Sequence, residues 1–260
     1  MDEAIHVDRV DRLRIEVHAD RAALGVAAAS AARRVMGEAI VRRGSCRTIF
    51  AAAPSQNELL AELRRADDVR WPRVEAFHMD EYCGLPGDSP CRFASFLRNR
   101  LFRHVPLQAA HYMDESGLSA VDEAGCYAAL LLSAPIDLVC LGVGENGHIA
   151  FNDPHVADFD DPLAAKEVRL DEACRLQQVH DGAFPDLAAV PDRAITLTIP
   201  TLMWGETLLC VVPGERKAPA VRSMLTGPVN ASCPASILRR HPSCTLYLDA
   251  DSAAEWLRTR

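Results

Sequence analysis

The side chains best suited to chemistry follow four predicted strands, at the point where each strand ends. These segments are residues 53–57, 78–82, 142–148 and 213–217. Parallel strands place their carboxyl ends at one edge of a sheet, so we expect the four segments to converge there. Together they supply carboxylates, a histidine, backbone N–H donors and a cation. This combination favours acid/base chemistry on a small, polar, anionic molecule.

Asp80 and Glu81 form an adjacent acidic pair just past one of these strands. Adjacent residues of an extended chain point to opposite sides, so only one of the two carboxylates faces a cleft. The neighbouring Phe77, Met79 and Tyr82 are apolar, and apolar surroundings raise the pKa of a carboxyl toward values useful for a general base. A solvated turn is the alternative interpretation.

Three glycines after a predicted strand form a Gly-x-Gly-x-x-Gly pattern: Gly142, Gly144 and Gly147. A dinucleotide-binding turn has this pattern but needs a helix directly afterwards, and residues 152–154 break the chain there. We therefore interpret the glycines as a sharp turn that approaches a ligand and presents His148. Asp153 is spaced to orient the imidazole and fix its tautomer. A structural histidine is the alternative.

Two predicted helices begin with polar or basic residues. One begins at Ser55 and Gln56, and the other at Arg216 and Lys217. Free N–H groups and the helix dipole favour an anion at such positions, so both starts are candidate anion-binding sites. For Ser55, an ordinary helix cap is an equal alternative.

Short apolar runs alternate along the chain with stretches in which apolar residues recur three or four apart. The runs predict strands at 14–17, 48–52, 74–77, 136–141, 194–197, 208–212 and 245–248. The stretches predict helices at 22–41, 56–65, 93–102, 120–132, 217–225 and 253–257. The alternation predicts an α/β protein whose mostly parallel sheet is covered on both faces. We expect one domain over residues 1–260, with a lid or excursion at about 155–191, where the pattern is least regular.

The composition is that of a folded, acidic chain. There are 28 Lys and Arg against 36 Asp and Glu, which gives a net charge of −8, so a nucleic-acid backbone would be repelled at long range. We find no secretory signal and no apolar run long enough to span a membrane. The nine cysteines are scattered, without Cys-x-x-Cys, so their spacing predicts neither a zinc site nor a disulfide framework. We expect a reduced, cytoplasmic protein without a metal.

Two segments, 77–86 and 141–154, closely resemble the signature segments of the glucosamine-6-phosphate deaminase/isomerase family. Weaker agreement extends from about residue 48 to residue 249. The resemblance implies a three-layer α/β/α sandwich with a modified Rossmann-like sheet. The related 6-phosphogluconolactonases share the glycine turn but typically continue His-Thr-Ala-Ser-Leu-Phe-Pro, whereas this chain continues Ile-Ala-Phe-Asn-Asp-Pro after His148. It therefore resembles the deaminases more.

The resemblance also implies a reaction in which an amino sugar phosphate opens its ring, moves a proton from C2 to C1 and loses ammonia. Asp80 would take the C2 proton, His148 would catalyse ring opening, and Asp153 stands where the family has glutamate. Asn146 completes the catalytic candidates. The substrate-binding candidates are Ser55, Gln56, Glu81, Gly144, Gly147, His180 and Lys217. This chemistry requires no metal or organic cofactor.

Several departures from the family pattern concern substrate recognition. Asn146 replaces a frequent aspartate, and His180 aligns with an arginine that holds the phosphate, although Lys217 is retained. The phosphate loop lacks the usual Thr-Gly-x-Thr-Pro, and Pro54 removes an N–H. The residues at 154–157 differ from the family's effector-binding segment, so we expect no allosteric site. These differences leave the exact sugar open.

Two other functions remain as alternatives. A sugar-phosphate lactonase would use the histidine and the cation without a proton-transfer role for Asp80. A non-catalytic sugar-phosphate sensor would bind the same ligand and act through a partner protein. In each case we expect a small sugar phosphate as ligand, neither nucleic acid nor membrane as partner, and self-assembly into a homo-oligomer as an open question.

Overall fold

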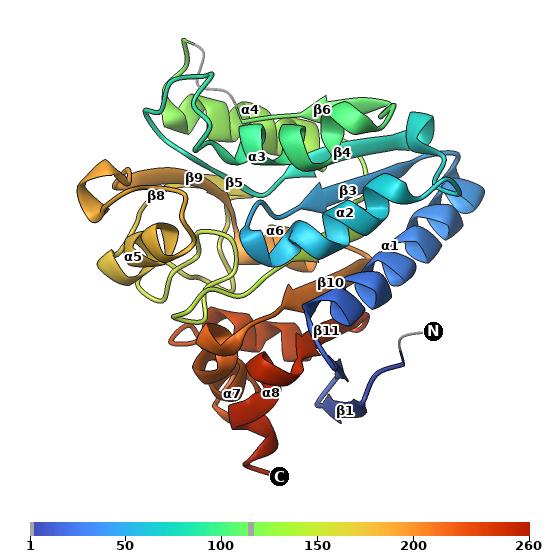
Figure 1. Ribbon diagram of the computed structural model, residues 1–260. Helices are drawn as coiled ribbons and strands as arrows, with labels where there is room; N and C mark the ends of the chain where they lie inside the picture. Colours follow the sequence, from blue (N-terminus) through green and yellow to red (C-terminus); the bar gives the residue numbers. More distant parts are fainter. Residues whose placement is uncertain (1–2, 114–116) are drawn as a thin grey trace.

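The computed structural model describes residues 3–113 and 117–260, and within them an eight-stranded sheet forms the centre of the protein (Figure 1). Its strand order is β1-β2-β11-β10-β7-β3-β4-β6. β1 is antiparallel to β2, and the remaining neighbours are parallel. The strands are β1 (His6–Val10), β2 (Leu13–His18), β3 (Cys46–Phe50), β4 (Val74–His78), β6 (Ala109–His111), β7 (Leu138–Leu141), β10 (Thr207–Val212) and β11 (Cys244–Asp249).

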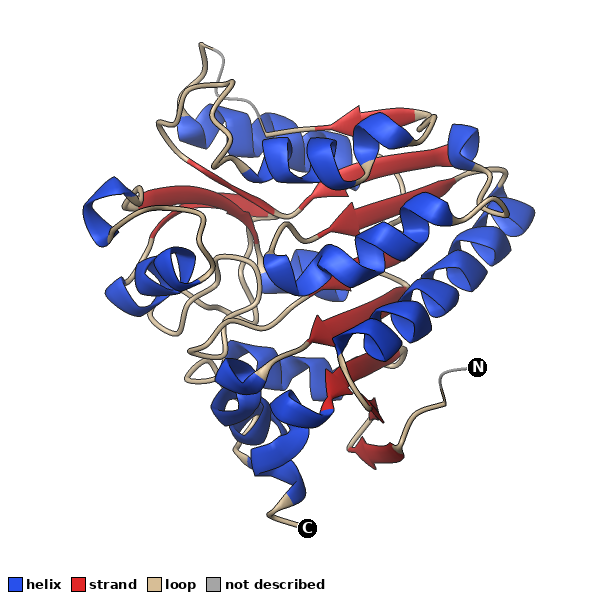
Figure 2. Cartoon of the chain, viewed as in Figure 1, coloured by secondary structure: helices blue, strands red, loops and turns tan. Residues whose placement is uncertain are grey.

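Helices cover both faces of this sheet (Figure 2). One face carries α1 (Arg21–Arg43), α2 (Asn57–Arg65) and α3 (Phe93–Arg100). The other carries α4 (Ala120–Leu132), α6 (Ile199–Met203), α7 (Ala218–Thr226) and α8 (Ala250–Leu257). Alternate residues of a strand enter the two cores: in β10, Leu208 and Cys210 pack on one face and Leu209 and Val211 on the other. The predicted three-layer α/β/α sandwich is confirmed.

Six of the seven predicted strands lie in the central sheet, and the seventh does not. Residues 194–197 belong to β9 (Arg193–Leu197), which pairs antiparallel with β5 (Asp80–Tyr82) and β8 (Ala165–Arg169) in a second sheet. The pattern missed the short strands β5 and β6 and the polar strands β1 and β8, because none contains a sustained apolar run.

The expected excursion at 155–191 has regular structure of its own. It contains β8, the helix α5 (Glu172–His180) and a short 3-10 helix at Leu187–Ala189. Asp171 caps α5 by accepting a hydrogen bond from the Cys174 N–H at 2.6 Å. Tyr82 of β5 donates a hydrogen bond to Gln178 at 2.7 Å, which ties α5 to the second sheet. Movement of this segment as a lid stays a prediction.

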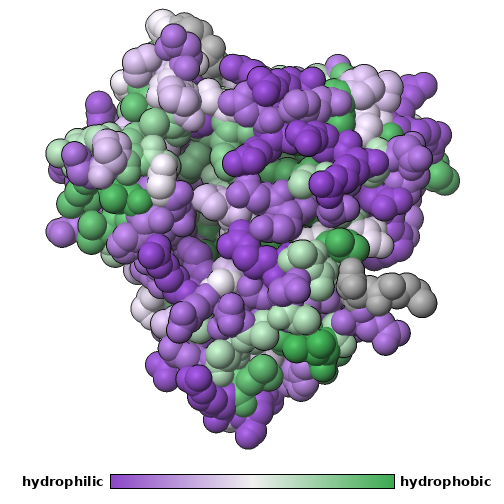
Figure 3. Space-filling view, in the orientation of Figure 1, coloured by the Kyte–Doolittle hydropathy of each residue, from purple (hydrophilic) through white to green (hydrophobic). Residues whose placement is uncertain are grey.

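None of the helices within the described residues combines the length and the apolar character needed to cross a bilayer. The face of the protein drawn in Figure 3 is mostly hydrophilic, and hydrophobic residues gather on it over the second sheet and α5.

Candidate active site

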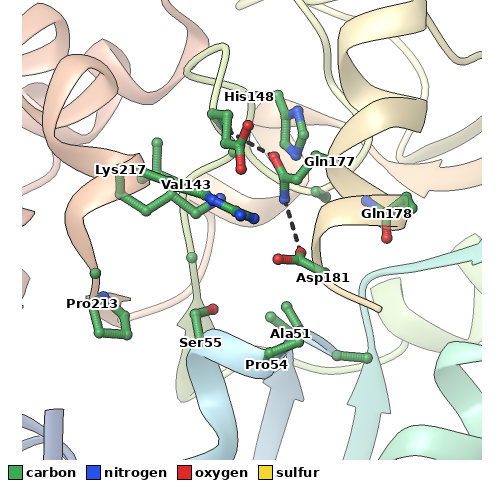
Figure 4. A pocket seen from close by; sticks show the side chains of 18 of the residues that line it. Ala51, Pro54, Ser55, Val143, His148, Gln177, Gln178, Asp181, Pro213 and Lys217 are labelled. Carbon is green, nitrogen blue, oxygen red and sulfur yellow. Dashed lines mark hydrogen bonds between the residues drawn. The ribbon is translucent and has the colours of Figure 1, made fainter. Parts of the chain in front are cut away.

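The four segments expected to converge do so around one pocket of about 400 Å³ (Figure 4). It lies at the carboxyl ends of β3, β4, β7 and β10, and α5 closes one side of it. Its polar lining comprises Arg21, Ser55, Asp80, Glu145, His148, Gln177, Gln178, Asp181, Glu215, Arg216 and Lys217. Acid/base groups and cations therefore share one cavity of the size that a small sugar derivative fills.

Asp80 faces the pocket from β5 and is buried. Its backbone is held opposite Thr196 of β9, so the second sheet fixes its direction. No other side chain or N–H of the described residues donates a hydrogen bond to its carboxylate. Burial, and then the neighbouring Glu81, raise the pKa of the Asp80 carboxyl well above its usual value. The structure thus presents a carboxylate of raised basicity to a ligand.

Glu81 does not line the pocket, and its role in substrate binding stays a prediction. Its carboxylate accepts hydrogen bonds from the N–H groups of Phe93 at 3.0 Å and Ala94 at 2.9 Å. Arg92 donates to it at 3.3 Å. These contacts hold the first turn of α3, so Glu81 anchors a helix beside Asp80. As predicted, only one of the two adjacent carboxylates faces the cleft.

His148 lies at the pocket wall, with Asp153 behind it. The imidazole Nδ1 lies 2.8 Å from Asp153 Oδ1. A carboxylate at this nitrogen favours a proton there, which leaves Nε2 as the ring nitrogen that can meet a ligand. This contact has the geometry that the predicted orientation of the imidazole by Asp153 requires.

Glycine is required at two positions of the turn, for different reasons. A Cβ at Gly144 would lie 2.2 Å from Cε1 of His148, so only glycine leaves room for the ring. Gly147 has φ of +85° and a Cβ there would lie 2.9 Å from Cys233 Sγ. Gly144 lines the pocket, whereas Gly147 does not and shapes the turn, so its contact with substrate stays a prediction.

Asn146 does not line the pocket and instead holds Asp153. Its Nδ2 donates to Asp153 Oδ1 at 2.9 Å, and its Oδ1 accepts from the His148 N–H at 3.0 Å. Burial raises the pKa of the Asp153 carboxyl, but the contacts with His148 and Asn146 outweigh it and the pKa lies below the usual value. Asn146 thus positions His148 in two ways: it binds the backbone N–H of His148, and it holds the Asp153 carboxylate beside the imidazole.

Lys217 provides a buried cation at the far side of the pocket. Among the described residues its ammonium has neither an ion pair nor a hydrogen bond. Burial lowers the pKa of Lys217, and the carboxylates of Asp181 and Glu145 partly offset that effect. In Figure 4, Lys217 and Asp181 approach the cavity from opposite sides. An anionic ligand could therefore pair with the Lys217 ammonium. The nearby carboxylates of Asp181 and Glu145 would oppose part of this attraction.

Two further predicted substrate contacts lie outside the pocket. Gln56 is buried beneath it, where its Nε2 donates to the Ser55 hydroxyl at 3.0 Å. His180 is half-exposed, and its Nδ1 lies 3.4 Å from Glu145 Oε2, so its role in place of the family's arginine stays a prediction. Gln56 supports Ser55, which does line the pocket.

The sequence did not identify four polar residues that line the pocket: Arg21, Gln177, Gln178 and Asp181. Arg21 follows the carboxyl end of β2, so the same rule that located the other segments points to it. It donates to the Pro54 carbonyl at 2.9 Å and to Glu58 at 3.1 Å, which fixes the Ser55 segment. The α5 residues carried no such signal, because their position depends on the second sheet.

The profile of the family described as glucosamine-6-phosphate isomerases/6-phosphogluconolactonase matches residues 19–247. The chain belongs to this family. Among curated members, the glucosamine-6-phosphate deaminase of Exiguobacterium sibiricum is 35% identical over 228 residues, covering 87% of this chain and 88% of that protein. The enzyme of the same name from Bacillus thuringiensis is 33% identical over 203 residues, covering 78% of this chain and 75% of its own.

Solved structures of the isomerase/lactonase family have the same fold. A monomeric glucosamine-6-phosphate deaminase superposes with a TM-score of 0.84 at 25% identity, covering 93% of this chain and 99% of that one. A 6-phosphogluconolactonase from Trypanosoma brucei gives a TM-score of 0.77 at 17% identity, covering 96% and 99%. The second likeness concerns the fold alone.

Proposed function

We propose that this chain converts an amino sugar phosphate, glucosamine 6-phosphate or a close analogue, and water into a ketose phosphate and ammonia. The observation that carries the proposal is the pairing in one pocket of the free Asp80 carboxylate with the His148–Asp153 pair. The curated relatives named glucosamine-6-phosphate deaminase support the same reaction.

Ring opening is the step assigned to His148. The hemiacetal opens when the C1 hydroxyl loses a proton and the ring oxygen gains one. With Nδ1 held at Asp153, Nε2 accepts the first proton and returns a proton to the ring oxygen. Asp153 stabilises the charged imidazole during this exchange, and Gly144 keeps the ring within reach of the ligand.

Proton transfer between C2 and C1 is the step assigned to Asp80. Its carboxylate removes the C2 proton from the open-chain aldehyde while the aldehyde oxygen gains a proton from the substrate's ammonium group, which gives an enolamine. The carboxylic acid so formed then protonates C1. The resulting ketimine adds water and releases ammonia. One carboxylate held over both carbons serves both transfers, and its raised pKa makes it a stronger base than an ordinary aspartate.

The phosphate is assigned to the end of the pocket near Ser55 and Lys217. The Ser55 hydroxyl and the Lys217 ammonium both line that end. The N–H groups of Glu215 and Arg216, at the start of the helical segment that leads into α7, have no acceptor among the described residues. These donors would meet the phosphate oxygens.

An assay of ammonia and ketose release across amino sugars, each with and without the 6-phosphate, tests the proposal. We expect equal amounts of both products from a phosphorylated 2-amino sugar. Hydrolysis of 6-phosphogluconolactone without ammonia from any amino sugar would indicate a lactonase instead. Stabilisation of the fold by several sugar phosphates without turnover would indicate a sensor. A cytoplasmic location and the assembly state stay predictions.

A further inference from the structure

Three metal-ligand side chains meet behind His148, on the side away from the pocket. They are His148, Asp153 of the same loop, and Cys174 in the first turn of α5. One ligand atom from each lies within 4.8 Å of the other two. Their exposed fractions are 7%, 0% and 1%, so the group is closed to bulk water.

Two polar atoms of this group are buried without a hydrogen-bond partner among the described residues. They are His148 Nδ1 and Asp153 Oδ2. The 2.8 Å contact between Nδ1 and the other carboxylate oxygen is close but not aligned as a hydrogen bond. Both atoms face other members of the group: Nδ1 lies beside Asp153, and the Asp153 carboxylate also interacts with the Cys174 thiol. A metal ion that displaced the protons of the imidazole and the thiol would therefore meet three ligands here.

The charges around the cluster favour a dication. Asp171 caps α5 next to Cys174, and its Oδ2 lies 3.8 Å from His155 Nδ1. Within the described part of the chain, no Lys or Arg lies at ion-pair distance from Asp153 or Asp171. A carboxylate and a thiolate would together balance two positive charges.

The donor set matches one metal in particular. Imidazole nitrogen, thiolate sulfur and carboxylate oxygen are the ligands that Zn²⁺ takes, at about 2.0 to 2.3 Å. Ligand atoms around a tetrahedral zinc ion therefore lie roughly 3 to 4 Å apart, close to the present spacing. The three atoms lie within 4.8 Å of one another, so they would move closer together around the ion and fill three of the four positions. Sequence spacing did not reveal the site, because Cys174 comes from a different segment.

We propose that His148, Asp153 and Cys174 form a Zn²⁺ site that switches the catalytic histidine off. Zinc on Nδ1 leaves the imidazole proton on Nε2, so the nitrogen that faces the pocket can donate but no longer accept a proton. The inhibitory effect rests on the function proposed above, whereas the binding of the metal does not. Zinc would thus act from behind the ring, without occupying the sugar pocket.

Metal binding to the whole chain tests the site without any activity assay. Titration with Zn²⁺ against a chromophoric chelator should show one tight equivalent, and Co²⁺ in its place should give a thiolate-to-cobalt charge-transfer band. Cys174→Ala should weaken Zn²⁺ binding by roughly 100-fold and abolish the band. Cys126→Ala is the matched control, since Cys126 is exposed on α4, and it should change neither readout.

The outcomes separate the two proposals. Binding of one Zn²⁺ that depends on Cys174 supports the site even if no amino sugar is a substrate. Equal binding by Cys174→Ala and the unaltered chain, or a Co²⁺ spectrum without a thiolate band, would overturn it. If the alanine variant does not fold, Cys174→Ser should show the same loss of Zn²⁺ binding. The Co²⁺ spectrum of the unaltered chain then tests for the thiolate ligand. Where deamination is found, Zn²⁺ should lower kcat in the unaltered chain and in Cys126→Ala but not in Cys174→Ala.

Discussion

The imidazole of His148 lies directly over Gly144, so closely that a Cβ at residue 144 would stand 2.2 Å from its Cε1 atom. The Gly144 N–H also donates to the His148 carbonyl at 2.9 Å, which closes the turn on itself. Gly144 therefore helps to position the imidazole ring, although it carries no reactive group.

Gly144→Ala should displace the ring of His148 and separate it from Asp153. Because ring opening depends on that contact, we expect kcat for deamination to fall by about 100-fold, within the range that general acid/base catalysis supplies. Steady-state ammonia release measures it. Gly125→Ala on α4 is the matched control, since a Cβ there meets no atom within 4 Å and its activity should be unchanged. Unaltered turnover in Gly144→Ala would contradict this role of the glycine.

Glu81→Gln should weaken the fold more than it weakens substrate binding. The buried carboxylate accepts hydrogen bonds from two N–H groups of α3 and from Arg92. Glutamine has a single acceptor oxygen, so one of these buried donors loses its partner and the free energy of unfolding should fall by about 1 to 3 kcal/mol. Urea titration measures this. Glu75→Gln removes the 3.3 Å pair of the partly exposed Glu75 with the buried Arg47. It should cost less than about 1 kcal/mol, because Arg47 keeps its hydrogen bonds to backbone carbonyls. A raised KM with unchanged stability in Glu81→Gln would instead support the substrate contact predicted from sequence.

Asp80 and Asp153 should have opposite effects on stability as pH changes. The folded-state pKa of Asp80 is raised, so its ionisation destabilises the fold as pH rises through that pKa. Asp80→Asn should therefore be more stable than the unaltered chain at pH 7, with the difference vanishing below about pH 4, where unfolded aspartate is protonated. Thermal unfolding across this pH range measures it.

Asp153→Asn should change the stability at pH 7 in the direction opposite to Asp80→Asn. The folded-state pKa of Asp153 is lowered, so its ionised form contributes stability that is lost as pH falls through that pKa. The variant should be less stable than the unaltered chain at pH 7 and should approach it in acid. The same sign of change at pH 7 for both variants would contradict the environments assigned to the two carboxyls.

Lys217→Met should raise KM for a phosphorylated substrate by roughly 10- to 100-fold, the worth of a hydrogen bond to a charged group. Its effect on kcat should be smaller, because the proposed binding mode places the ammonium at the phosphate and not at the reacting carbons. Asp181→Asn should act in the opposite direction and lower KM, since it removes a negative charge near the phosphate end. Equal KM values for phosphorylated and free sugars in the unaltered chain would show that Lys217 does not bind a phosphate.

The sequence predicted the position of the pocket because four of the segments that line it follow strands with a clear apolar run. Asp80, His148, Ser55 and Lys217 were located in this way, and all four line the cavity. Which of Asp80 and Glu81 faces the pocket was not predictable. β5 is three residues long, and its pairing with β9 determines which side chain points to the pocket.

The α5 wall of the pocket could not be predicted for a related reason. Gln177, Gln178 and Asp181 lie on one side of α5 or just after it, and a helical pattern alone does not say what that side faces. Its place depends on β8, which pairs with β9 across a long separation in sequence. His180, one residue before Asp181, does not line the pocket, and its Nδ1 lies 3.4 Å from Glu145 Oε2.

The fate of the C2 hydrogen in Asp80→Asn tests the proposed reaction most directly. With glucosamine 6-phosphate deuterated at C2, the unaltered chain should move the label to C1 of the ketose phosphate or to water, followed by NMR. Asp80→Asn should bind the sugar and leave the label at C2, with transfer slowed by about 10³-fold or more. Transfer of the label by the variant at the rate of the unaltered chain would contradict the account.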